Sequence, residues 1–163
     1  MNTDAFYQTV AGLCFTLLGL WWAVVQFRHD EWMSDLPHRR VAYSVHLSFL
    51  VPGIMSLGAL TMGDIKLIWR LVFISAAVFG LAAMLFLITS GMPTIGGRLV
   101  SLGRWLSVLL YALIAIIAAA PNLSLLFAPE LKPLQIEGLL LTLLVFLGAS
   151  LAWSALMAPE RNA

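Results

Sequence analysis

The chain has 163 residues, of which 61% are hydrophobic and 10% are charged, and its mean hydropathy is +0.96. Soluble domains carry about a quarter charged residues, so this chain has too few charges to cover the surface of a water-soluble globule. The formal net charge of +1 at pH 7 excludes a strongly basic or acidic binding face, and we expect no nucleic-acid partner. The lipid bilayer is therefore the expected surrounding of most of the protein.

Five apolar segments are each long enough to cross a bilayer. They cover residues 5–27, 41–62, 67–88, 105–127 and 134–157. A spanning helix needs about 20 residues, whereas a barrel strand has about 10 residues of alternating polarity. We therefore predict an all-α polytopic transmembrane helix bundle of about five spans, with residues 1–163 as a single transmembrane domain. Pro121 and Asn122 interrupt the fourth segment, and this helix either ends there, kinks or continues to its expected end.

The distribution of arginine and lysine indicates how the helices are oriented. The connection after the first span holds Arg28, Arg39 and Arg40, and the connection after the third holds Arg98 and Arg104. Because positively charged connections stay in the cytoplasm, we predict the N-terminus outside and the C-terminus inside. We expect a multi-pass protein of a cell membrane, of the prokaryotic inner-membrane type.

Small and polar residues recur along the first span at steps of three or four. They are Gln8, Gly12, Thr16, Gly19, Ala23 and Gln26. This spacing places all of them on one face of a helix. The face either lines a water-filled path, in a homo-oligomer whose first helices meet around an axis, or lets a neighbouring helix approach closely. Close approach would occur within one protomer, between copies, or in a larger membrane complex.

Two charges lie inside predicted spans at a similar depth from the outer side. Arg70 follows Lys66 by one helical turn, and Glu137 follows Lys132 by little more than one turn. An intramembrane charge costs about 2.5 to 3.5 kcal/mol on insertion scales and usually finds a partner in the bundle interior. We predict that Arg70 and Glu137 form an ion pair between the third and fifth spans. The alternatives are snorkelling to the interface and a charged selectivity element at an outer mouth.

His46 lies inside the second predicted span, on its cytoplasmic side. An imidazole titrates near neutral pH, so His46 either relays protons or gates with pH, or it simply hydrogen-bonds a neighbouring helix. A single intramembrane histidine does not supply paired axial ligands for a haem. The connection 28–40 carries two histidines and three carboxylates but no accepted metal-ligand spacing. We interpret it as a solvated loop, and we expect neither a cofactor nor a metal.

Sequence signatures of the common enzyme classes are missing from the chain. It contains no H-E-x-x-H, G-x-S-x-G, P-loop or G-x-G-x-x-G motif, and we do not expect an enzyme. The hypothesis that the sequence favours is an oligomeric ion channel or small-solute transport protein with the first-helix face at the pore or the protomer interface. The competing hypothesis is an accessory or structural subunit that packs against partner proteins and permits no permeation of its own. A third hypothesis is an intramembrane receptor or a lipid-binding protein.

Overall fold

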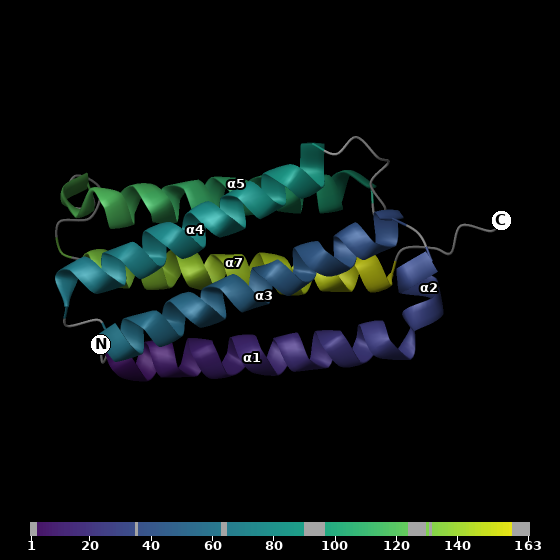
Figure 1. Ribbon diagram of the computed structural model, residues 1–163, viewed down its shortest axis with the longest axis horizontal. Helices are drawn as coiled ribbons and strands as arrows, with labels where there is room; N and C mark the ends of the chain where they lie inside the picture. The colour runs from purple at the N-terminus through teal and green to yellow at the C-terminus, as the bar shows by residue number, and fades with distance from the viewer. Residues whose placement is uncertain are drawn as a thin grey trace.

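The computed structural model describes residues 3–34, 36–62, 65–89, 97–123, 130 and 132–157. The helices are α1 (Thr3–Phe27), α2 (His29–Ser34), α3 (Leu36–Met62), α4 (Lys66–Thr89), α5 (Gly97–Ala119), the 3-10 turn η1 (Pro121–Leu123) and α7 (Pro133–Leu156). In the part of the chain so described, α1, α3, α4, α5 and α7 are long and apolar enough to cross a membrane. The predicted all-α bundle with five spans is confirmed (Figure 1). The orientation of its ends stays a prediction.

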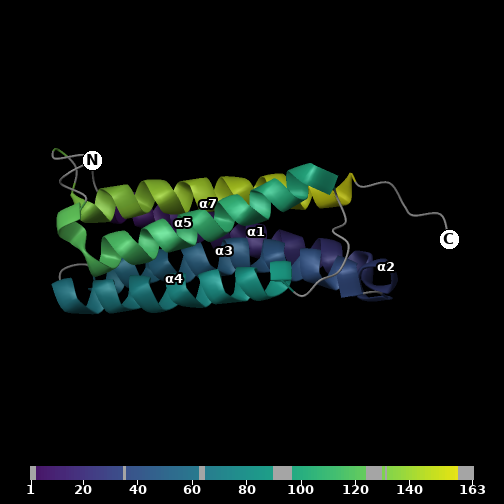
Figure 2. The same cartoon turned by 90° about the horizontal axis from the view of Figure 1, so that it is seen from above.

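Four of the long helices form a ring, and α1 packs against the outside of it. Around the ring, α3 packs on α4, α4 on α5, α5 on α7 and α7 on α3. This order places α3 diagonally opposite α5, and α4 diagonally opposite α7. Helix α1 packs along α3 and also touches α7. Figures 1 and 2 show the helices lying nearly side by side, with α4 and α7 on opposite sides of the bundle.

Two glycines allow the helices of the ring to approach closely. A Cβ atom built on Gly80 of α4 would lie 2.6 Å from the Tyr111 ring of α5. A Cβ atom built on Gly148 of α7 would lie 2.7 Å from the Cβ of Ser48 of α3. In lipid, helices associate through close van der Waals packing, which small residues permit. The ring is therefore tightly packed at both of these crossings.

The fourth predicted span, 105–127, differs from α5 at both ends. The helix begins earlier, at Gly97, and ends at Ala119. It ends there because Pro121 has no N–H to continue the helical ladder, and the chain turns into η1. Residues 124–127 of the predicted span lie outside the described residues. Because α5 begins early, Arg104 lies inside a membrane-spanning helix and not in a connection.

We expected the segment 28–40 to be a solvated loop; its described residues are mostly helical, while His29, Asp30 and Arg39 are exposed. It forms α2 and the first turn of α3, which begins at Leu36. Trp32 of α2 is only 2% exposed, and its ring lies edge-on to Trp21 of α1 with 5.3 Å between the ring centroids. The burial of this large aromatic side chain holds α2 against the end of the bundle.

Candidate functional site

Buried polar side chains lie along α3 and α5, the two helices that are diagonally opposite in the ring. We call this set the polar seam, and it comprises Ser44, Ser48 and Ser56 of α3 with Arg104, Ser107 and Tyr111 of α5, each at most 4% exposed. Within each helix the spacing is three, four or eight residues, which keeps the members on one face. The hydroxyl of Tyr111 donates a hydrogen bond of 3.2 Å to the carbonyl of Leu47. This bond joins α5 to α3 across the ring at the level of Leu47.

The seam offers oxygen atoms that can still accept hydrogen bonds. Three serine hydroxyls donate to the carbonyl one turn earlier in their own helix: Ser44 to Arg40 at 2.8 Å, Ser48 to Ser44 at 2.9 Å and Ser107 to Gly103 at 3.0 Å. Each hydroxyl keeps its lone pairs for another donor. Pro52, inside α3, has no N–H to give to the carbonyl of Ser48.

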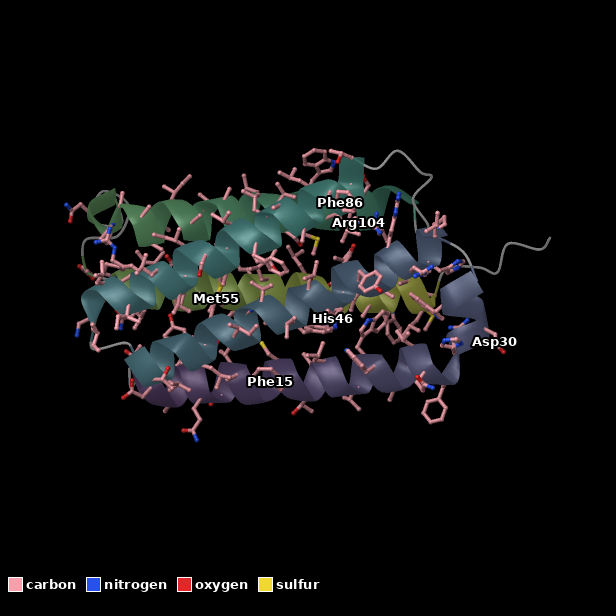
Figure 3. The ribbon with its side chains drawn as sticks, viewed as in Figure 1. Phe15, Asp30, His46, Met55, Phe86 and Arg104 are labelled. Atoms are coloured by element: carbon pink, nitrogen blue, oxygen red, sulfur yellow. The ribbon has the colours of Figure 1, made fainter. Side chains whose placement is uncertain are left out.

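Arg104 is the charged member of the seam and is 4% exposed. Its Nε and Nη2 atoms have no hydrogen-bond partner among the described residues. The charge of Arg40 on α3 acts on it, and this interaction is repulsive because both side chains are cations. A guanidinium group stays protonated in proteins, so Arg104 cannot escape the cost of burial by becoming neutral. Figure 3 shows Arg104 on the α2 side of Met55.

Glu137 lies in the first part of α7, near the opposite end of the bundle. It is fully buried, and neither carboxyl oxygen has a hydrogen-bond partner in the described part of the chain. It shares the core-facing side of α7 with Leu141 and Leu144, which are also buried. An ionised Glu137 would act on Tyr7 of α1, whose hydroxyl donates a 2.6 Å hydrogen bond to the carbonyl of Leu134. Glu137 is therefore an unpaired carboxyl group in an apolar and aromatic environment.

The predicted ion pair between Arg70 and Glu137 is not formed. Arg70 donates from Nε to the carbonyl of Ala118 at 2.8 Å, and from Nη2 to the carbonyl of Ala119. These carbonyls belong to the last turn of α5, where they have no partner within the helix and where the helix dipole attracts a cation. Since α4 and α7 lie diagonally across the ring, the similar depth of the two charges does not bring them together.

His46 lies outside the polar seam and connects α3 to α1. The indole Nε1 of Trp22 donates a 3.0 Å hydrogen bond to Nδ1 of His46. Because an indole N–H can only donate, Nδ1 is the unprotonated nitrogen of this imidazole. The two rings border a surface cavity of about 270 Å³ between α1 and α3, together with Gln26 and Tyr43. The hydrogen bond to a neighbouring helix is thus observed, and a role in proton relay stays a hypothesis.

The small and polar face of α1 points away from the bundle. Its members Gln8, Gly12, Thr16, Gly19, Ala23 and Gln26 are all exposed. The space around Gly12 and Gly19 is open, with nothing within 4 Å of an added Cβ atom. The opposite face of α1 carries the buried residues Tyr7, Cys14 and Trp21. Close packing of the small face within one protomer, one of our alternatives, is not observed.

Arg104 is the site residue that sequence reasoning missed. We placed it in a connection because the fourth span was taken to begin after it. The periodic positions Val100, Arg104, Ser107, Tyr111 and Ile114, followed by Pro121, would have indicated a helix that begins earlier. All five of the helical positions are buried in α5.

Together, the five apolar helices define a multi-pass membrane protein in contact with the lipid bilayer. In comparisons with known proteins, no family model, no curated protein and no solved structure matches this chain.

Proposed function

We propose that the protein transports a small ion or polar solute through the interior of the four-helix ring, along the polar seam. The observation that carries this proposal is the burial of Arg104 and Glu137, where Nε and Nη2 of the arginine and both carboxyl oxygens of the glutamate have no hydrogen-bond partner among the described residues. An unpaired ionisable group in a membrane bundle destabilises the fold and is a marker of an ion or substrate pathway. A bundle with a purely structural role gains stability from apolar residues at such positions.

Arg104 and Glu137 lie at different depths in the membrane. At 1.5 Å per residue, Arg104 lies about 10 Å from the beginning of α5, at the end of the bundle where α2 lies. Glu137 lies about 6 Å from the beginning of α7, at the other end. Ser107 and Tyr111 follow Arg104 along α5, toward the end where Glu137 lies. A solute that moved along the ring would pass their hydroxyl groups.

Transport along the seam requires the ring helices to separate, because Gly80 and Gly148 leave no room for even a methyl group. Pro52 supports such a movement. It lies within α3 and removes one backbone hydrogen bond at the level of Ser48. Helices of transport proteins bend at positions of this kind, where the freed carbonyl lies inside the protein.

A flux measurement in proteoliposomes tests the proposal. The purified full chain is reconstituted, and the uptake of inorganic cations, inorganic anions and small organic acids is compared with that of empty liposomes. For a species that the wild-type protein carries, Arg104→Gln and Glu137→Gln are expected to lower the rate by about tenfold, or about 1.4 kcal/mol in the barrier. The matched controls are Arg39→Gln and Glu130→Gln, because both side chains are exposed. Equal rates for all four variants would contradict the proposal.

A second candidate function is that of an accessory subunit, which docks on another membrane protein or on a second copy of itself. The exposed small face of α1 supports it, because a row of small residues at a lipid-facing surface allows another helix to approach closely. If several copies assembled with this face around a central pore, the protein would both associate through the face and transport a solute along it.

A further inference from the structure

We propose that Glu137 is a proton-binding site, which holds a proton in the packed bundle and releases it to water when the beginning of α1 moves away from α7. The coupling of this proton binding to transport rests on the proposed function. The protonation of Glu137 itself can be measured without any transport assay.

The first argument is the environment of the carboxyl group. An ionised carboxylate only accepts hydrogen bonds and has about four lone-pair sites to satisfy. Both oxygens of Glu137 lack a donor among the described residues, and the side chain is fully buried. Tyr7 cannot satisfy them with its hydroxyl proton, because this proton is given to the carbonyl of Leu134 at 2.6 Å. Since a bare carboxylate in an apolar interior is very costly, the packed arrangement favours the protonated acid.

The second argument concerns the identity of the ligand. A metal cation in place of the proton requires several oxygen ligands around it. Besides the carboxyl of Glu137, the oxygens placed here by the described contacts are the Tyr7 hydroxyl and the Leu134 carbonyl, and these two already bond each other. A proton needs only the carboxyl group itself. The site therefore fits a proton better than a metal cation.

Few charged groups of the described residues lie near Glu137. Helix α7 packs against α3, α5 and α1. Among the described residues, Tyr7 of α1 is an ionisable group close enough for an ionised Glu137 to act on it, and the Glu137 side chain is fully buried. Arg70 of α4 is engaged by the last carbonyls of α5. In the part of the chain that the structure describes, no cation donates a hydrogen bond to the carboxyl group of Glu137.

Access for the proton comes from the end of the bundle where α1 and α7 begin. Two aromatic residues of α1 cover this region, and the rings of Phe6 and Tyr7 lie edge-on with 5.5 Å between their centroids. A Cβ atom added to Gly138, the residue after Glu137, would lie 2.6 Å from the ring of Phe6. Glu137 is only about one helical turn from the beginning of α7. A small displacement of the first turns of α1 thus opens a short route from water to the carboxyl.

Infrared spectroscopy of the full chain in lipid vesicles tests the protonation directly. We expect the C=O stretch of a carboxylic acid at mildly acidic pH, its loss at alkaline pH, and its absence at every pH in Glu137→Gln. The control Glu130→Gln, which replaces an exposed carboxyl, is expected to retain the band. Glutamine imitates the neutral acid, so the Glu137→Gln variant should fold and melt like the wild type. A spectrum in which Glu137→Gln removes no such band, or removes one that is insensitive to pH, overturns the proposal.

Labelling with a membrane-soluble carbodiimide gives a second readout. The protonated carboxyl adds across a C=N bond of the reagent, and the adduct rearranges to a stable N-acylurea that contains all atoms of both reactants. We expect the label on Glu137, with a rate that falls as the pH rises. A rate that does not depend on pH counts against the site. If the acid band and the label are present while wild-type liposomes show no flux, the proton site stands and the transport proposal falls. If wild-type liposomes show flux but the acid band is missing, the transport proposal stands and the proton site falls.

Discussion

Arg104 is a cation that the folded bundle buries at 4% exposure without a counter-ion among the described residues. If this burial serves a ligand and not the fold, a neutral apolar side chain of similar length should stabilise the protein. We therefore expect Arg104→Met to raise the unfolding free energy by about 2 kcal/mol, since it removes the cost of an intramembrane charge. Thermal unfolding in detergent, followed by tryptophan fluorescence, measures this change.

The control for this prediction is Arg39→Met, which replaces an exposed arginine near the same end of the bundle and should leave the melting temperature unchanged. A lower melting temperature for Arg104→Met would mean that the guanidinium has a stabilising partner in the folded protein. That result would remove the observation on which the transport proposal rests.

At the scale of residues, the sequence predicted which charged side chains lie inside the membrane better than it predicted which residues surround them. Glu137 and Arg70 were recognised as intramembrane charges from their positions in apolar segments. Their separate environments depend on which helices are adjacent in the ring, and this is not encoded in the depth of a residue along its helix. Arg70 has a strong alternative partner in the carbonyl groups of Ala118 and Ala119, which have no partner within the helix because α5 ends there.

Helix crossings in this bundle depend on single glycines. We expect Gly148→Ala to lower the unfolding free energy by about 1 to 3 kcal/mol, because the added methyl group would lie 2.7 Å from the Cβ of Ser48, which cannot rotate away. Gly80→Ala is expected to act in the same direction through the ring of Tyr111. Thermal unfolding in detergent checks both variants.

The matched substitution is Gly12→Ala, where the added methyl group meets nothing within 4 Å. Alanine favours the helix over glycine by about 1 kcal/mol, so this variant should be as stable as the wild type or more stable. Loss of stability in Gly12→Ala comparable to that in Gly148→Ala would show that glycine content, and not contact at the crossings, limits the stability.

At the scale of elements, the five spans could be predicted because each is an apolar run of sufficient length. Their ends were less predictable. Helix α5 begins before the fully apolar run, since its first turns carry Arg98, Ser101 and Arg104. Helix α2 was missed because six residues with several charges give no apolar period, and its position depends on the contact of Trp32 with Trp21.

The whole molecule presents the small face of α1 to its surroundings. If a second copy docks there, Gly12→Leu and Gly19→Leu should separate the copies without disturbing the protomer, in which both positions are open. Overpacking of about 1 to 3 kcal/mol corresponds to an association about 5- to 150-fold weaker. Light scattering of the protein in detergent, or photobleaching of labelled copies in vesicles, gives the oligomeric state.

For comparison, Leu109→Ala removes an exposed side chain from α5, away from α1, and should not change the association. If the wild-type protein is a monomer at all concentrations, copies do not pair through the small face of α1. The same conclusion follows if the copies associate and both leucine variants leave the association intact.

The sequence identified the small face of α1 but not the direction in which it points. In a soluble protein the apolar side of a helix faces the core, whereas lipid is as apolar as the protein interior, so polarity alone does not distinguish the two sides of a membrane helix. The direction depends on contacts of the opposite face, where Tyr7, Cys14 and Trp21 are buried and where α1 packs against α3 and α7.

The order of the helices around the ring also has a consequence for biosynthesis. The most extensive contacts join helices that are made one after the other, α1 with α3 and α4 with α5. Each pair can form a hairpin as soon as it leaves the ribosome, because local contacts form first. Helix α7 is synthesised after both hairpins and packs on both, through α3 and α5. We therefore expect the ring to stay open on one side until α7 inserts and brings the carboxyl group of Glu137 into the bundle.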